Sequence, residues 1–198
     1  MIRPLLAIAL VATTSADTPP TRSAPSSSPA NHGNSQATSE AEASYRHGLA
    51  SADGDGVPQN YATAAQYYLK AAEKGHIKAQ YNLAYLYANG LGVQKDSKQA
   101  AAWFRKAADQ GDPEAQNNLG VLYATGEGVR RNDTEAVRWY RLAAGQGDVE
   151  GMNNLAAMYL GGRGVARDLT RAFELCQKAA ESGCATAQNN LALMYANG

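Results

Sequence analysis

The apolar and polar positions of this chain recur at a fixed step of 36 residues. Valine marks the step most simply, at Val57, Val93, Val129 and Val165. The same step separates Tyr87, Tyr123, Tyr159 and Tyr195, and it also separates Gly54, Gly90, Gly126 and Gly162. A period of this length is typical of small supersecondary units that stack in a row, and not of one closed core.

Each unit is predicted to hold two helices. In the second unit the first helix is expected over Ala79–Ala88, where Leu83, Leu86 and Tyr87 recur at helical spacing on one apolar face. Gly90 follows this run and is expected to end the helix, because glycine reaches the left-handed backbone region without strain.

The second helix of each unit begins at a side chain that can accept hydrogen bonds from the first free amides. These predicted caps are Asn60, Asp96, Asn132 and Asp168. Gln99 and Glu135 stand three residues after two of the caps and are expected to bond back to the cap's own amide, as in a capping box. The second helices are predicted to end at Gly75, Gly111, Gly147 and Gly183.

A single helix pair of this kind cannot bury its own apolar face, so neighbouring units must stack. The bulky side chains predicted to fill the space between helices are Tyr67, Trp103, Trp139 and Leu175. The expected fold class is all-α, an α/α superhelical solenoid of antiparallel helix pairs with a 36-residue repeat.

These residues resemble the Sel-one-like repeat, a relative of the tetratricopeptide repeat. The shared pattern is Ala-Gln-x-Asn-Leu-Gly/Ala-x-Leu-Tyr, then Gly-x-Gly-Val, then Ala-x-x-Trp-Tyr/Phe-x-x-Ala-Ala-x-x-Gly, over about Ala43 to Gly198. The resemblance implies a right-handed solenoid that acts as an adaptor for protein complexes, and it implies no chemistry. The first unit departs from the pattern at His47, Ala50 and Ser51, as a terminal cap would.

The N-terminal part of the chain has the composition of an export signal followed by a linker. Arg3, the apolar run Pro4–Ala12 and the small residues before a cut after Ala16 predict a signal peptide over residues 1–16. Residues 17–42 are rich in Pro, Ser and Thr and are predicted to be a disordered tether, which leaves 43–198 as the repeat domain. A periplasmic or secreted location follows, with no membrane insertion after the signal is cut.

Charge and motifs argue against several classes of function. The formal net charge is zero, which gives no reason to expect nucleic acid as a partner. The segment Gly126–Gly128 and its copies follow helices, so they are predicted to be turns and not nucleotide-binding loops. His47 and His76 have no clustered ligands nearby, and no carboxylate pair is fixed by a motif. No cofactor, no metal site and no enzyme activity are therefore expected.

The two cysteines raise an alternative function, because relatives of this family are rich in cysteine. Secreted cysteine-rich proteins that resemble this chain are associated with penicillin binding and β-lactamase activity, but their paired cysteines would stand at Ala180 and Gln188 here. Cys176 and Cys184 are out of that register, and helix rise alone would separate them by about 10 Å. A buried thiol at Cys176 is favoured over a disulfide. The chain also lacks the Ser-x-x-Lys tetrad of serine β-lactamases.

The predicted function is binding of a protein or peptide in the concave groove of the solenoid. Amides placed once per repeat can bond the backbone of an extended peptide, with tyrosines adding apolar contact. The candidate binding residues are Tyr81, Asn82, Tyr85, Asn117, Asn118, Asn153, Asn154, Asn189 and Asn190. The same asparagines would equally serve to bond neighbouring repeats and hold the solenoid together.

Overall fold

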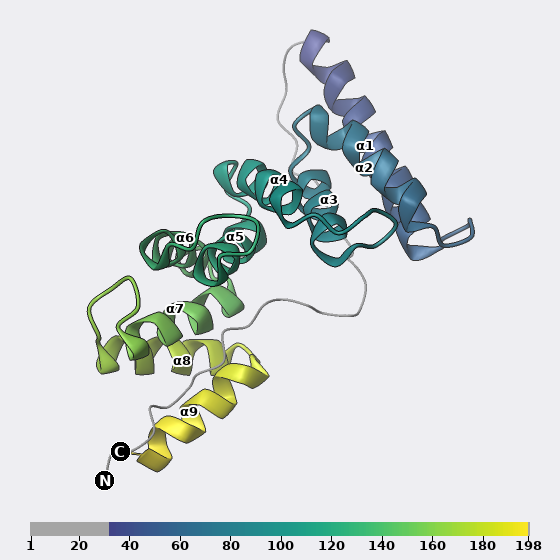
Figure 1. Cartoon of the computed structure of the whole chain (residues 1–198). Helices are drawn as coiled ribbons and strands as arrows, with labels where there is room; N and C mark the ends of the chain where they lie inside the picture. The colour runs from purple at the N-terminus through teal and green to yellow at the C-terminus, as the bar shows by residue number, and fades with distance from the viewer. Residues whose placement is uncertain (1–31, 198) are drawn as a thin grey trace. The chain divides into compact units, whose positions relative to one another are not determined.

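The computed structural model describes residues 32–197, and every regular element in that range is an α-helix (Figure 1). The helices are α1 (His32–Asp53), α2 (Tyr61–Glu73), α3 (Ile77–Asn89), α4 (Ser97–Asp109), α5 (Pro113–Thr125), α6 (Asp133–Gly145), α7 (Val149–Gly161), α8 (Leu169–Glu181) and α9 (Ala185–Asn197). The predicted all-α class is confirmed. The predicted signal peptide over 1–16 lies outside the described residues.

The described helices divide into two compact units. One contains α1 to α4 and ends at Gln110, and the other contains α5 to α9 and begins at Gly111. Within each unit every helix packs against the next one along the chain. Helices α2 to α9 are all 13 residues long, as a fixed repeat requires.

Helix α1 is longer than the sequence predicts. It begins at His32, inside the segment 17–42 that was predicted as a disordered tether, so that boundary needs correction. Near the predicted boundary, Glu40 forms an ion pair with Lys74 and Ala41 is buried, so residues 40 and 41 belong to the packed part of the chain. Residues 17–31 lie outside the described part of the chain.

The predicted caps of the second helices are confirmed. Asn60, Asp96, Asn132 and Asp168 all accept a hydrogen bond from the first turn of the helix that they precede. The predicted capping boxes at Gln99 and Glu135 are wrong. The cap's backbone amide already donates to the preceding helix, from Asp96 to Tyr87 O (3.0 Å) and from Asn132 to Tyr123 O (2.9 Å).

Two glycines of the interhelical turns are required by close packing as well as by backbone conformation. Gly92 and Gly164 have φ angles of 66° and 65°. A side chain at Gly92 would overlap the backbone of Tyr61 at the start of α2, and one at Gly164 would overlap the backbone of Asp133 at the start of α6. These turns are therefore contacts between repeats, and not only connections within one.

A small residue on the first helix of each repeat stands in register with one position on the second helix. The register pairs are Gly48–Tyr68, Ala84–Phe104, Gly120–Tyr140 and Ala156–Cys176. An added Cβ at Gly120 would lie 2.6 Å from the ring of Tyr140, so the tyrosine ring occupies the space that a side chain would fill. Glycine thus stands opposite each tyrosine, whereas alanine stands opposite Phe104 and Cys176.

Both cysteines are free thiols, which confirms the prediction of a buried thiol over a disulfide. Cys176 is fully buried, and burial raises its pKa to about 11. Cys184 is half-buried and its Sγ accepts a hydrogen bond from the amide of Ala187 (3.4 Å) at the start of α9.

Candidate functional site

Four of the predicted binding asparagines pair with each other inside the α5–α9 unit. Asn154 Nδ2 on α7 donates to Asn117 Oδ1 on α5 (2.9 Å), and Asn190 Nδ2 on α9 donates to Asn153 Oδ1 on α7 (2.8 Å). All four side chains are buried. The bonds join the first helices of neighbouring repeats, which is the structural role that the sequence left open beside partner binding.

The predicted residues of the α1–α4 unit lie on α3. Tyr81 is buried, with its ring edge-on to Phe104 at 5.7 Å between centroids. Asn82 is also buried, and Tyr85 is half-buried. Two of these three side chains are therefore part of the packing between helices.

Two predicted residues of the α5–α9 unit reach its surface. Asn189 on α9 is exposed, and Asn118 on α5 is half-buried and donates to the carbonyl of Glu114 within its own helix (3.0 Å). Together with Tyr85, they are the members of the predicted set that a partner could touch.

A second set of amide pairs was missed by the sequence analysis. Gln110 Nε2 donates to Gln80 Oε1 (2.7 Å), and Gln146 Nε2 donates to Gln116 Oε1 (2.8 Å) one repeat later. Each pair joins the first helix of a repeat to the residue that follows its second helix. The signal was present in the sequence, because both partners shift by one repeat length.

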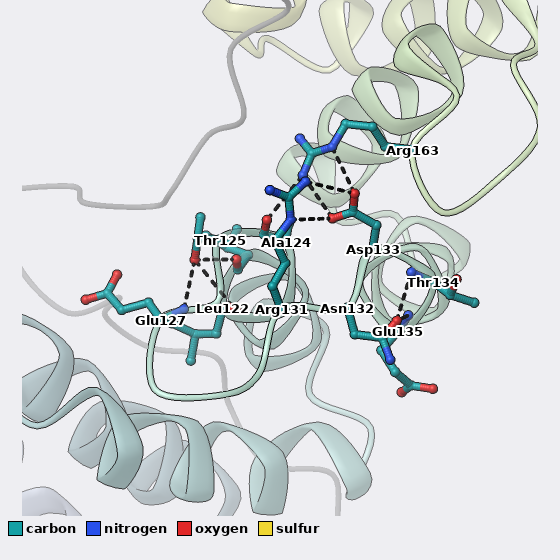
Figure 2. A network of polar contacts seen from close by, with 11 residues as sticks. Leu122, Ala124, Thr125, Glu127, Arg131, Asn132, Asp133, Thr134, Glu135 and Arg163 are labelled. Atoms are coloured by element: carbon teal, nitrogen blue, oxygen red, sulfur yellow. Dashed lines mark hydrogen bonds and ion pairs between the residues drawn. The ribbon is translucent and has the colours of Figure 1, made fainter.

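An arginine in the turn before α8 fixes one repeat to the preceding one (Figure 2). Arg163 donates to both carboxylate oxygens of Asp133, at 3.2 and 3.0 Å, and to the carbonyl of Ala124 at 3.1 Å. Arg131 contacts the same carboxylate from the other side (3.1 Å). The hydrogen bond from Arg163 lowers the pKa of Asp133. Burial raises this pKa and the bond from Arg131 lowers it further, so that the pKa stays below its usual value.

Asp148 and His76 are two of the titratable side chains that cap helices. Asp148 caps α7 with a 2.6 Å bond from the amide of Gly151, and burial raises its pKa to about 6. His76 caps α3 through Nδ1, and its Nε2 lies 3.1 Å from Glu42. No group of three His, Cys, Asp or Glu side chains suited to a metal ion occurs in the described range. None of the helices in that range is both long and apolar enough to span a membrane.

Comparison with known proteins identifies the repeat. The Sel1 repeat pattern matches residues 41–76, 77–112, 113–148, 149–184 and 185–198. A crystal structure of c5321, a protective antigen of uropathogenic Escherichia coli with an SLR fold, is 39% identical with a TM-score of 0.77, covering 85% of this chain and 37% of that chain. A Sel1 repeat protein from Oxalobacter formigenes is also 39% identical with a TM-score of 0.77, covering 82% of this chain and 64% of its own. A search of the curated proteins found no match.

A more distant similarity is to the cysteine rich protein B of Helicobacter pylori. It is 26% identical with a TM-score of 0.52, over 65% of this chain and 92% of that chain. This chain spans less than two thirds of the length of the first two structures, so their activities as whole proteins are not transferred to it.

The similarity to these structures confirms the predicted α/α solenoid class. Sel1 repeat proteins are typically scaffolds for protein interactions, and they are generally not enzymes. Since the repeat pattern matches this chain without a break from residue 41 to residue 198, the chain belongs to the Sel1 repeat family.

Proposed function

We propose that this chain is an exported scaffold that binds a protein or peptide segment in a concave groove lined by the first helices of its repeats. The observation that carries the proposal is the unbroken run of Sel1 repeats over residues 41–198. In the α5–α9 unit, buried asparagines join the first helices of neighbouring repeats, and exposed side chains on those helices are available for a partner.

The accessible part of the predicted site supports binding to an extended segment. In the α5–α9 unit, Asn118 on α5 and Asn189 on α9 carry amides at the surface or close to it. An amide offers both a donor and an acceptor, as a peptide backbone requires. In the α1–α4 unit, Tyr85 adds a half-buried ring on α3. The buried asparagines would act through this surface by fixing the spacing of its helices.

Site-specific photo-crosslinking tests the groove. A photoreactive residue at Asn118 or Asn189 in the full chain should capture one partner protein from the exporting cell. The matched control is the same residue at Gln177, which is exposed on α8, a second helix. Capture at the two asparagine positions but not at Gln177 would support the groove, whereas equal capture at all three positions, or none at any, would contradict it.

Export is the second part of the proposal. The apolar run after Arg3 and the small residues before Asp17 favour cleavage after Ala16. Mass spectrometry of the chain recovered from the periplasm or the medium should give a mature protein that starts at Asp17. Recovery only from the cytoplasm, with Met1 or Ile2 at the start, would contradict export and leave the groove proposal in place.

The alternative function, binding or hydrolysis of penicillins, has no residue assigned to it. Turnover of a chromogenic β-lactam by the pure protein above that of a mock preparation would support an enzyme, and would contradict the scaffold as its sole function.

A further inference from the structure

Two arginines from different helices converge on one tyrosine hydroxyl in the α5–α9 unit. Arg141 Nη2 on α6 donates to Tyr159 Oη on α7 (3.1 Å), and Arg171 Nη1 on α8 donates to the same oxygen (3.5 Å). Each guanidinium also lies 5.8 Å from the centroid of the tyrosine ring. Tyr159 is only 6% exposed, whereas both arginines are exposed. A buried side chain therefore holds two solvent-accessible cations together.

The arginine pair is not part of the structural pattern of the repeat. Tyr87 stands at the equivalent position in the α1–α4 unit, and the positions equivalent to the two arginines are Leu69 and Gln99. For Tyr123 the same register gives Arg105 and Glu135, which carry opposite charges. Because the repeat recurs with uncharged or oppositely charged residues at these positions, its fold does not explain two cations around Tyr159.

The two arginines beside Tyr159 differ in how their charges are balanced, because the acidic side chains nearby act on Arg171 and none is paired with Arg141 among the described residues. Asp168 lies 3.4 Å from Arg171 and balances one positive charge, and Glu174 on the same helix acts on Arg171 from farther away. Among the described residues, the polar contact of Arg141 is the tyrosine oxygen alone. Burial raises the pKa of Tyr159, but the hydrogen bonds from the two arginines outweigh burial and hold it below its usual value. The surroundings of this oxygen thus favour negative charge.

We propose that Arg141, Tyr159 and Arg171 form an anion-binding site that holds a carboxylate side chain of an acidic peptide segment. Guanidinium groups match the planar carboxylate with paired N–H donors. An isolated carboxylate gains little from exposed charges of this kind, so the occupant must bring further contacts, as a peptide does and a free small anion does not. The site goes beyond the proposed amide groove, because its two cations stand on the second helices α6 and α8 and its tyrosine on α7 is buried.

Binding of a fluorescein-labelled hexaglutamate peptide to the full chain tests this site by fluorescence anisotropy. The peptide should bind the wild type at low ionic strength and weaken as salt is added. Arg141→Gln and Arg171→Gln should each weaken binding by about threefold to fivefold, because each removes a charge-assisted bond at an exposed site. Arg138→Gln is the matched control, since it removes one exposed charge from α6 outside the cluster and should change binding by less than about twofold.

Two further measurements separate the sources of the anion and the role of the tyrosine. Inorganic phosphate at matched ionic strength should displace the peptide only at far higher concentration, and displacement by phosphate at concentrations similar to those of the peptide would contradict a peptide ligand. Tyr159→Phe keeps both charges and the ring but removes the oxygen that orients them, and should weaken the peptide severalfold. Equal losses of peptide binding in Arg138→Gln and Arg141→Gln would overturn the site. Unchanged peptide binding in Arg141→Gln and Arg171→Gln, together with lower stability to unfolding, would also overturn it and would leave the two arginines with a purely structural role.

Discussion

The two units of this chain use different chemistry at the same position of the repeat. In the α1–α4 unit the position is occupied by Tyr45 and Tyr81, and in the α5–α9 unit by Asn117 and Asn153. Tyr45 stacks on His76 at 4.3 Å between ring centroids, and Tyr81 meets Phe104 edge-on. The two asparagines instead accept hydrogen bonds from the asparagines of the following repeat.

One register position thus makes different contacts in the two units, since Tyr81 meets the second helix of its own repeat and Asn117 meets the first helix of the following repeat. Aromatic packing depends on buried area and tolerates small shifts. A buried amide pair depends on bond geometry, and loss of one partner leaves the other with an unmet polar group. The stability of the α5–α9 unit should therefore respond more strongly to single polar substitutions than that of the α1–α4 unit. Substitution of a turn glycine should destabilise both units alike.

The largest expected effect is common to both units. Gly92→Ala and Gly164→Ala should each destabilise the fold by about 3 kcal/mol or more, because each adds a side chain against backbone atoms at a positive φ. Gly75→Ala is the control, with a φ of 85° but no atom within 4 Å of the added Cβ, and should cost about 1 kcal/mol. Urea unfolding measures all three, and equal losses would rule out the packing contact.

Breaking the amide pair should have the next largest effect. Asn117→Ala removes the acceptor of Asn154 and should cost about 2 kcal/mol, with a coupling of about 1 kcal/mol in the cycle with Asn154→Ala. Additive losses in the double variant would mean that the two side chains act independently.

The pH dependence of stability should reside partly in the α5–α9 unit. The pKa of Asp148 is about 6 in the folded chain, above its ordinary value, so its stabilising contribution is full below about pH 4 and is lost as pH rises through 6. Asp148→Asn keeps a capping side chain and should raise stability above pH 7 by on the order of 2 kcal/mol, with little change near pH 4. Thermal unfolding across this range checks it, and a constant difference at every pH would refute the burial effect.

The smallest effect is expected in the aromatic unit. Phe104→Leu removes the edge contact with Tyr81 but keeps most of the apolar volume, so it should cost about 1 kcal/mol. A loss as large as that of Asn117→Ala, measured by the same urea unfolding, would remove the distinction between the two units.

The sequence was sufficient for features that are local or periodic. The period of 36 residues predicted the helix pairs, and the polar residues at Asn60 and Asp96 predicted the starts of second helices. The capping boxes failed because the amide of Asp96 bonds to Tyr87, a partner in the preceding helix that local spacing does not reveal. The boundary of the tether was misplaced in part because Glu40 pairs with Lys74, a residue far along the chain that local composition does not reveal.

The sequence predicted less about the candidate binding residues than about the fold. Recurrence of Asn82, Asn118 and Asn154 indicated a shared role but could not distinguish a buried position from an exposed one. That distinction depends on how neighbouring repeats stack, and it places Asn154 in a buried amide pair while leaving Asn118 half-buried. The cluster around Tyr159 could not be predicted from the repeat, because its two arginines stand on different helices and occur together around only one of the recurring tyrosines.

Hydrogen exchange of the side-chain amides, measured by NMR, tests most directly whether the buried asparagines join the repeats. The account predicts that the Nδ2 protons of Asn154 and Asn190 are strongly protected, while those of Asn189 exchange at the rate of an exposed amide. Rapid exchange at all three positions would contradict the amide pairs, and would return these asparagines to the surface as candidates for direct contact with a partner.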